Sequence, residues 1–296
     1  MSWTRNDIPN LRGKICIVTG ANTGLGFAQA LALAAKHATV VLACRHAERA
    51  ESALRRLRSE MPDADVCVSL LDLSSFASVR DFAKRFGEEF NHLDVLINNA
   101  GLMVTSRQTT TDGFEMQFGT NYLGPYLLTG LLLPHIEKAE AARVVSLSSL
   151  TYRFSRIHFD DINAERSFSP MDRYAQSKLA CLMFALELQR RLDECGARTI
   201  SLGAHPGVST SELGRNTSGF NFMARFVNQS TEAGAEPALR AATDPSARGG
   251  EYYGPANWFG ARGPAIIELP SRRARDAESA ARLWALSETL SGIRYP

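Results

Sequence analysis

The sequence predicts an α/β protein with a single doubly wound, Rossmann-type parallel sheet of about seven strands, flanked by helices. Two observations lead to this fold class. Short runs rich in β-branched residues, such as 14–19 and 95–97, have the continuous apolar pattern of strands buried on both faces. Helical segments separate these runs repeatedly, and such alternation is typical of parallel sheets.

The first half of the chain supplies four of the expected strands and three helices. The strands are expected at 14–19, 39–43, 66–71 and 95–97, and the helices at 27–36, 48–59 and 76–90. Ser74 and Ser75 precede the third helix and can cap its amino terminus. Right-handed crossovers would wind the sheet in two halves around its first strand.

The second half continues the alternation up to residue 204 and then becomes less regular. Helices are expected at 114–133, 173–195, 232–242 and 276–291, and strands at 143–147, 199–204 and 251–253. The first of these helices should stop near Pro134. No linker rich in Pro or Gly divides the chain, so we expect one nucleotide-binding domain over residues 1–296.

Composition and charge exclude several classes of protein. Of the 296 residues, 45% are hydrophobic and 22% are charged, as in ordinary globular proteins. The formal net charge of +2 gives no field that would steer the chain toward DNA, so we expect no nucleic-acid partner. Five cysteines and six histidines are scattered without the spacing of metal ligands, so we expect no metal site.

The sequence shows no pattern of a targeting signal or a membrane anchor. Its first residues lack the apolar core of a signal peptide. The longest lipid-like run, 127–133, is far shorter than the ~20 apolar residues of a membrane-spanning helix. We therefore expect a cytoplasmic protein without stable insertion into a membrane.

A glycine-rich turn follows the first expected strand and precedes the first helix. Gly20, Gly24 and Gly26 suit backbone that turns tightly and approaches a pyrophosphate at a helix amino terminus. The spacing G-x-x-x-G-x-G differs from the general dinucleotide pattern G-x-G-x-x-G. A tight turn without a ligand is the alternative, and we favour nucleotide binding.

Arg45 stands after the second expected strand, where dinucleotide folds usually carry an acidic residue that binds the adenosine ribose. An acid would repel a 2′-phosphate, whereas a guanidinium can hold it with two hydrogen bonds. A solvated surface arginine is the alternative. Given a nucleotide site, Arg45 favours NADP(H) as the cofactor, with NAD(H) also possible.

Tyr174 and Lys178 lie four residues apart in an expected helix and therefore share one face of it. Such a pair is common on solvated helices, and it indicates a functional site only together with the motifs around it in the sequence. Ser149 follows the fifth expected strand, and Asn121 lies in a helical segment. A phenol, an ammonium, a hydroxyl and a carboxamide on a chain with a nucleotide-binding turn indicate proton transfer beside a redox cofactor.

These motifs, taken in order with Asn98-Asn99-Ala100-Gly101 and Pro206-Gly207, resemble the short-chain dehydrogenase/reductase family. Within it, the sequence is most similar to the retinol dehydrogenase-like branch and related bacterial oxidoreductases. The segments that carry this closer resemblance are Phe-Gly-Thr-Asn-Tyr-Leu-Gly at 118–124, Ser-Lys-Leu-Ala at 177–180, Ala-His-Pro-Gly at 204–207 and Arg-Leu-Trp-Ala-Leu-Ser-Glu at 282–288. The resemblance covers nearly the whole chain.

The resemblance implies roles for individual residues. Its catalytic set comprises Asn121, Ser149, Tyr174 and Lys178, with Tyr174 as the general acid/base. The expected cofactor-binding residues are Gly20, Asn22, Thr23, Gly24, Leu25, Gly26, Arg45, Asp72, Leu73, Asn98, Ala100, Gly101, Tyr174, Lys178, Pro206, Gly207 and Val208. Either Thr210 or Ser211 would supply a further hydroxyl near the nicotinamide.

The region at about 208–232 is expected to form the substrate loop. Its apolar cluster at 220–227 is either a mobile lid or a small satellite core, and we favour the lid. A lid of this kind implies a lipophilic ketone, aldehyde or alcohol as substrate. The family also implies assembly as a homodimer or homotetramer through the helices expected at 114–133 and 173–195.

Three features depart from the family pattern. The gap between Ser149 and Tyr174 is longer than in compact members, although the retinol dehydrogenase-like branch has a similar insertion. Asn22 and Thr23 replace the basic residue that some NADP-preferring members carry in the glycine turn, so the NADP prediction rests mainly on Arg45. We also expect no amino-terminal membrane anchor of the kind that many animal retinoid enzymes carry, which argues against a membrane-bound retinoid role.

The main hypothesis is therefore an NADP(H)-dependent oxidoreductase that interconverts a carbonyl compound and its alcohol. The alternative from another class is a protein that binds NADP as a sensor or scaffold without turnover. A sugar-nucleotide epimerase ranks last, because it usually has a different glycine spacing and a longer carboxyl-terminal substrate domain.

Overall fold

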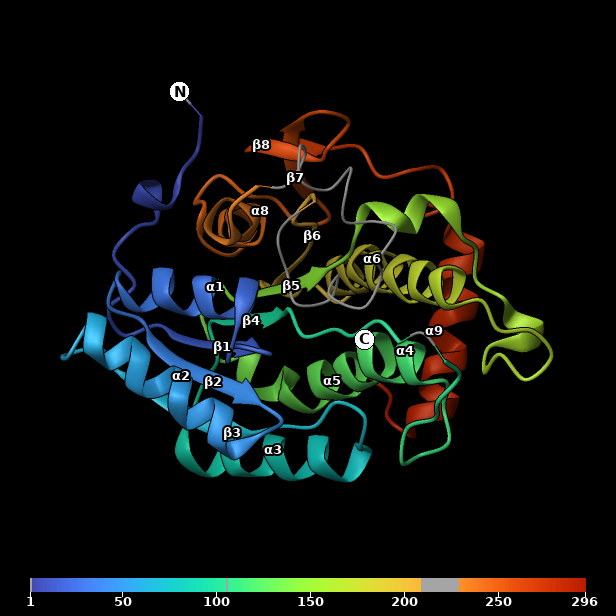
Figure 1. Ribbon diagram of the computed structural model, residues 1–296, viewed down its shortest axis with the longest axis horizontal. Helices are drawn as coiled ribbons and strands as arrows, with labels where there is room; N and C mark the ends of the chain where they lie inside the picture. The colour runs from blue at the N-terminus through green and yellow to red at the C-terminus, as the bar shows by residue number, and fades with distance from the viewer. Residues whose placement is uncertain (1, 105, 209–228) are drawn as a thin grey trace.

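A single sheet runs through the molecule in the order β3-β2-β1-β4-β5-β6-β7-β8 (Figure 1). The computed structural model describes residues 2–104, 106–208 and 229–296. The strands are β1 (Ile15–Thr19), β2 (Thr39–Cys44), β3 (Val66–Leu70), β4 (Val95–Asn98), β5 (Arg143–Leu147), β6 (Ile200–Ala204), β7 (Tyr252–Asn257) and β8 (Arg262–Glu268). All neighbouring strands are parallel except β7 and β8.

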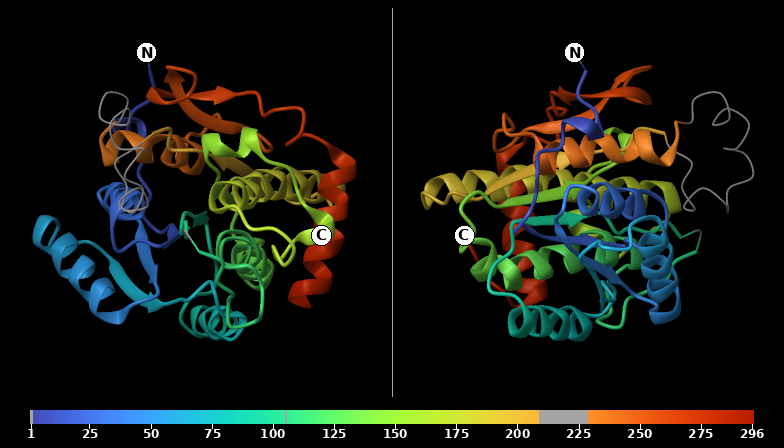
Figure 2. Two further views of the ribbon diagram at one scale, coloured as in Figure 1. Left: turned by 45° about the vertical axis from the view of Figure 1, so that its right-hand side comes forward. Right: turned by 90° about the vertical axis from the view of Figure 1, so that its left-hand side faces the viewer.

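The doubly wound parallel sheet is confirmed, and the described residues form eight strands where about seven were expected. The additional strand, β8, folds back antiparallel on β7 after a turn in which Trp258 and Phe259 have positive φ. Gly263 and Pro264 interrupt the strand pattern at its start, which explains why the sequence did not predict it. β8 forms one edge of the sheet and β3 the other (Figure 2).

Helices cover both faces of the sheet. The longer ones are α1 (Gly24–Ala34), α2 (Ala47–Glu60), α3 (Phe76–Glu89), α5 (Gly124–Ile136), α6 (Pro170–Glu194), α8 (Thr231–Thr243) and α9 (Ala277–Ser291). One core joins α1, α2 and α8 to a face of the sheet, and the other joins α3, α5 and α6 to the opposite face. Figure 1 shows α8 beside α1 and, across the sheet, α5 above α3. The unbroken sheet supports the proposal of a single domain.

Alternate residues along a strand enter opposite cores. In β1, Ile17 belongs to the core beneath α3 and α5, whereas Cys16 and Val18 belong to the core beneath α1. All three are fully buried, as the continuous apolar pattern of this strand predicts. The strand order reverses between β1 and β4, so a crevice is expected at their carboxyl ends.

The helix expected at 114–133 is a composite. It consists of α4 (Met116–Phe118), a π-helical turn η2 (Gly119–Leu123) and α5, and Pro134 lies inside α5 rather than after it. A proline near the carboxyl end of a helix removes one backbone hydrogen bond. The helix ends two residues after Pro134. The π turn inserts one residue into the helical repeat, which hydrophobic spacing alone does not reveal.

The carboxyl-terminal residues cover the outer faces of α5 and α6. Trp284 of α9 stacks on Phe184 of α6, with ring centres 5.9 Å apart, and packs edge-on against Tyr126 of α5 at 5.2 Å. Tyr295 follows α9 and lies over Gly130, where an added Cβ would stand 2.5 Å from its ring. α9 and Tyr295 therefore occupy part of the outer surface of these two helices.

Candidate active site

The glycine turn is shaped by close contacts as well as by positive φ. Gly20 and Gly24 have φ of +67° and +56°, a region that favours glycine. A Cβ on Gly26 would lie 2.5 Å from the carbonyl oxygen of Gly20, so no other residue fits there without movement. Thr23 is the N-cap of α1 but makes no side-chain capping hydrogen bond. The amino terminus of α1 is thus free of a side-chain cap, as a phosphate site requires.

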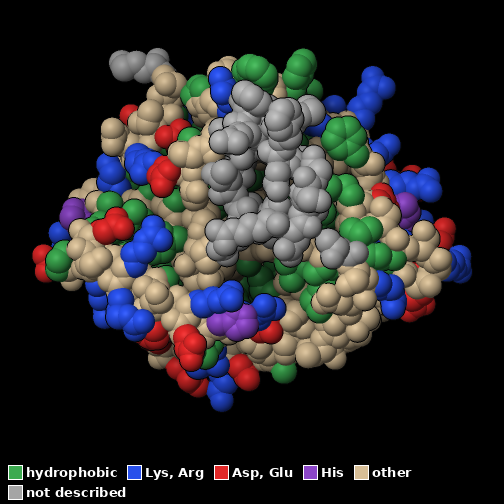
Figure 3. Space-filling view, viewed as in Figure 1, with side chains coloured by type: hydrophobic (Ala, Val, Ile, Leu, Met, Phe, Trp, Pro, Cys, Tyr) green, Lys and Arg blue, Asp and Glu red, His purple; other side chains and the backbone are tan. Residues whose placement is uncertain are grey.

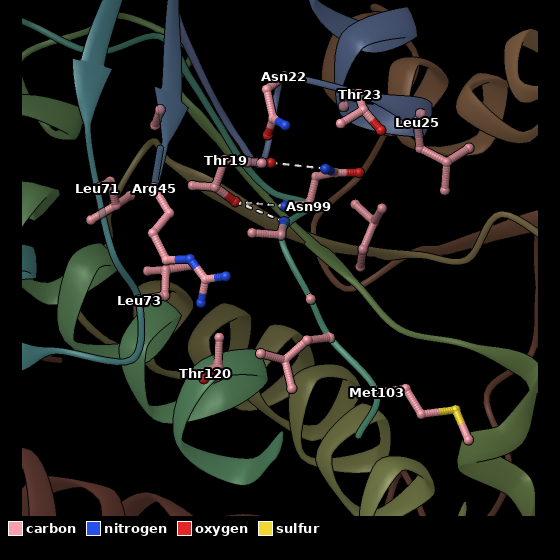
Figure 4. Close-up of a pocket in the computed structure, with 18 of the residues that line it drawn as sticks. Thr19, Asn22, Thr23, Leu25, Arg45, Leu71, Leu73, Asn99, Met103 and Thr120 are labelled. Atoms are coloured by element: carbon pink, nitrogen blue, oxygen red, sulfur yellow. Dashed lines mark hydrogen bonds between the residues drawn. The ribbon is translucent and has the colours of Figure 1, made fainter. Parts of the chain in front are cut away.

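The segment after β4 braces this turn. Thr19 accepts hydrogen bonds at Oγ1 from the N–H groups of Asn99 (3.0 Å) and Ala100 (2.9 Å), and its carbonyl accepts from Asn99 Nδ2 at 2.8 Å (Figure 4). Asn98 is buried and donates to Thr129 Oγ1 at 3.1 Å, away from the turn. Asn99, which the sequence analysis did not select, therefore holds the turn in place.

A cavity of about 380 Å³ lies at the carboxyl ends of β1, β2, β4 and β5. Its walls bring together fourteen of the predicted site residues. These are Gly20, Asn22, Thr23, Gly24, Leu25, Gly26, Arg45, Asp72, Leu73, Ala100, Gly101, Tyr174, Lys178 and Pro206. The lining also contains Thr19, Ala43, Leu71, Leu102, Met103, Thr120 and Leu147, which the sequence analysis did not single out as site residues. These side chains are apolar or small, so no motif in the sequence marks them as site residues.

Basic side chains line one end of the cavity. Arg45, His46 and Arg49 all contribute to its wall, and the space-filling view shows basic groups and a histidine gathered on one rim of the hollow (Figure 3). Arg45 donates from Nε to His46 Nε2 at 3.0 Å, which leaves its terminal nitrogens for another acceptor. Asp72 lies nearby, with one carboxylate oxygen accepting from the N–H and hydroxyl of Ser74.

Tyr174 and Lys178 lie at the other end, on the first turns of α6. Ser169 and Pro170 begin this helix, and proline is favoured at such a position. Lys178 is 4% exposed and donates from Nζ to the carbonyl of Leu147 at 3.1 Å. Its ammonium lies 5.9 Å from the ring centre of Tyr174. The pair is thus held in the cavity and not on a solvated helix face.

Neither Ser149 nor Asn121 lines the cavity. Ser149 is the N-cap of the short helix η3 (Leu150–Phe154), and its Oγ accepts from the N–H and hydroxyl of Thr151. Ser148 lines the cavity instead, and its hydroxyl donates to the carbonyl of Lys178 at 2.8 Å.

Asn121 lies in the π turn and joins two segments of the site. Its Oδ1 accepts from the N–H of Leu102 at 2.8 Å, and its Nδ2 donates to the carbonyl of Leu102 and to Ser177 Oγ, each at 2.9 Å. The Asn121 carbonyl accepts from Cys181 Sγ at 3.1 Å. The amide therefore ties the chain after Gly101 to the helix that carries Lys178.

Pro206 lines the cavity and leads into Gly207 and Val208. Gly207 has φ of +66°, and Val208 donates to the carbonyl of Ala261 at 2.8 Å. Thr210, Ser211 and the cluster at 220–227 lie outside the described residues, as does most of the expected substrate loop.

Within the described ranges, no three His, Cys, Asp or Glu side chains are placed to hold a metal, and no helix is long and apolar enough to cross a membrane.

The comparisons with known proteins agree with this geometry. A family profile described as short chain dehydrogenase matches residues 14–218. The chain therefore belongs to the short-chain dehydrogenase family. Human retinol dehydrogenase 13 is 41% identical over 96% of this chain and 86% of its own length, and mouse retinol dehydrogenase 12 is 39% identical over 96% and 88%. The chain is an oxidoreductase of this family, which acts on CH–OH and C=O groups.

Two solved structures are similar in fold. An uncharacterized protein from Mycobacterium paratuberculosis superposes with a TM-score of 0.84 at 40% identity, and all of each chain is covered. A protein from Shigella flexneri, assigned as a short chain dehydrogenase and complexed with NADP, gives a TM-score of 0.67 at 21% identity, with 82% of this chain and 97% of that chain covered.

Proposed function

We propose that the protein is an NADP(H)-dependent oxidoreductase that interconverts a lipophilic ketone or aldehyde and its alcohol. The observation that carries this proposal is a single cavity with Arg45 at one end and Tyr174 with Lys178 at the other. The NADP in the Shigella flexneri structure supports the cofactor, with NAD(H) as the less favoured choice. The names of the retinol dehydrogenase relatives support a lipophilic substrate.

The cavity residues fit a dinucleotide. The amino terminus of α1, free of a side-chain cap, would receive the pyrophosphate, and Gly20 and Gly26 leave no side chain in its way. The terminal nitrogens of Arg45 would hold the 2′-phosphate. When bound, the nicotinamide supplies the hydride chemistry, and the protein positions the reactants and moves the proton.

Tyr174 would act as the general acid/base. The Lys178 ammonium stabilises negative charge that develops on the phenol oxygen, because opposite charges attract strongly in a buried site. Tyr174 then gives its proton to the carbonyl oxygen in reduction or takes it from the alcohol in oxidation. Ser149 would hold the substrate oxygen, and Asn121 would fix the loop against which Lys178 lies.

The test compares Tyr174→Phe with wild type in NADPH-dependent reduction of a panel of lipophilic aldehydes and ketones. We expect the variant to lose roughly 10²–10⁴-fold in kcat, the range of general acid/base catalysis. Tyr295→Phe is the matched control, since it removes a hydroxyl that donates to the Tyr126 carbonyl far from the cavity. Equal turnover by wild type and Tyr174→Phe would overturn the proposal.

A further inference from the structure

A series of hydrogen-bonded side chains joins the segment after Ser149 to the backbone of Gly207. His205 is fully buried, and both ring nitrogens are engaged. Nδ1 accepts from the N–H of Gly207 at 3.2 Å, and Nε2 lies 3.2 Å from Glu268 Oε1. The other oxygen of Glu268 accepts from Arg153 Nη2 of η3 at 3.1 Å. Because an N–H donor faces Nδ1, the imidazole proton must be on Nε2 and point at Glu268.

The fold leaves space for this pair by placing glycines around it. A Cβ on Gly254 of β7 would lie 2.0 Å from His205 Nε2, and a Cβ on Gly260 would lie 3.1 Å from Glu268 Oε1. Tyr252 covers the imidazole, with ring centres 5.2 Å apart. Complete burial of His205 and partial burial of the Glu268 carboxylate are costly unless each group has partners. Here each of them has a hydrogen-bonding partner on both sides.

Gly207 is held by its neighbours from two directions. Its N–H is bound by His205, and a Cβ on Gly207 would lie 2.3 Å from the Ala261 carbonyl oxygen. Pro206, the preceding residue, lines the same cavity as Tyr174 and Lys178. His205 and Glu268 do not line it, so any effect on catalysis must pass through the backbone of 206–208.

We propose that His205 and Glu268 are positioning residues that fix the Pro206-Gly207 backbone against the nicotinamide end of the site. This inference rests on the proposed function for its catalytic consequence. The imidazole holds the Gly207 N–H, and Glu268, itself held by Arg153, fixes the imidazole tautomer and ring orientation. A displaced segment would allow the nicotinamide to bind in more than one orientation.

The test uses two substitutions of nearly equal shape. In His205→Asn, the side-chain oxygen can still accept from the Gly207 N–H, as in an Asx turn. His205→Leu has no acceptor for this N–H. We expect amide exchange at Gly207, measured by NMR without cofactor, to be about tenfold faster in His205→Leu than in His205→Asn. Glu268→Gln, which keeps the hydrogen-bonding shape but not the charge, should accelerate this exchange less.

The second readout is the face from which hydrogen is transferred. NADPH carrying deuterium on one face of C4 should transfer label from a single face in wild type and His205→Asn, and from both faces in His205→Leu. A general loss of stability would lower turnover without changing the face. Equal Gly207 exchange in the Asn and Leu variants, or unchanged facial selectivity, would overturn the inference. Absence of hydride transfer in wild type would overturn the proposed function, while the exchange data would still decide whether His205 holds Gly207.

Discussion

The ammonium of Lys178 lies 3.0 Å from the position that a Cβ on Gly101 would occupy. Gly101→Ala should therefore displace the Lys178 ammonium from its present position without disturbing the core. We expect kcat to fall about tenfold, the cost of misplacing a charge by a fraction of an ångström in a buried site. The free energy of unfolding should change by less than about 1 kcal/mol.

The matched control for this prediction is Gly113→Ala, at a glycine with open space around its Cβ position but with φ of +86°. It should lower stability through backbone strain and leave kcat unchanged. Steady-state kinetics and urea unfolding of both variants check the contrast. A Gly101→Ala enzyme with unchanged kcat would show that the lysine moves aside at no cost to activity.

Arg45 sets the cofactor preference in the proposed function. Arg45→Asp removes a guanidinium from the cavity rim and adds a charge that repels phosphate. We expect NADPH affinity to fall by about 1.5–3 kcal/mol, and NADH affinity to change little. Cofactor fluorescence titration measures both. Arg55→Asp, with the same change of charge at an exposed position of α2 outside the cavity, is the control. Tighter binding of NADH than NADPH by wild type would contradict the assignment.

Trp284 joins α9 to the two helices beneath it. Its indole lies among the rings of Tyr126, Phe184 and Tyr295, and the Arg191 guanidinium stacks on it at 4.4 Å. Trp284→Ala should lower the free energy of unfolding by roughly 3–5 kcal/mol. Trp284→Phe should cost much less, because it keeps an aromatic ring in the cluster. Urea unfolding distinguishes the two, and a loss below 1 kcal/mol for the alanine variant would mean that α9 contributes little to stability.

Asp161 should make stability depend on pH at the acidic end. The N–H of Arg166, with those of Glu165 and Ser167 and the Arg173 guanidinium, holds the pKa of Asp161 below its ordinary value. A depressed pKa in the folded state means that the stabilisation is complete above the ordinary value of about 3.9 and is lost as pH falls through the folded-state value. The difference in urea midpoint between wild type and Asp161→Asn should therefore be largest near neutral pH and shrink below about pH 4. A difference that is constant from pH 7 to pH 3 would contradict this account.

Much of the fold was predictable because each local pattern had one physical explanation. The apolar runs of β1 and β4 are buried on both faces, and the glycines of the first turn lie where a side chain would collide with backbone. The presence of Tyr174 and Lys178 in one cavity follows from their spacing on a helix, and their catalytic roles remain a prediction. The expected substrate loop lies mostly outside the described residues.

Other features depend on contacts between distant parts of the chain. Asn99 braces Thr19 across two strands, and Glu268 reaches His205 from a strand that the sequence did not predict. Arg173, next to Tyr174, is 3% exposed and binds Asp161 in the insertion that follows Ser149. No spacing rule connects residues so far apart in the sequence. Their pairing follows only once the sheet has formed.

The π turn at Gly119–Leu123 makes the site sensitive to chain length as well as to residue type. Gly124 donates its N–H to the carbonyl of Gly119, five residues back, so one more residue is accommodated than in a regular turn. Deleting a single residue from this turn would restore the α-helical repeat and change the direction of the side chains within the turn, whereas the helices on either side would keep their faces. Asn121 would then face away from Ser177, although every side chain named in the site would still be present in the sequence. Homologues that differ by one residue here would need a different way to join the segment after Gly101 to α6.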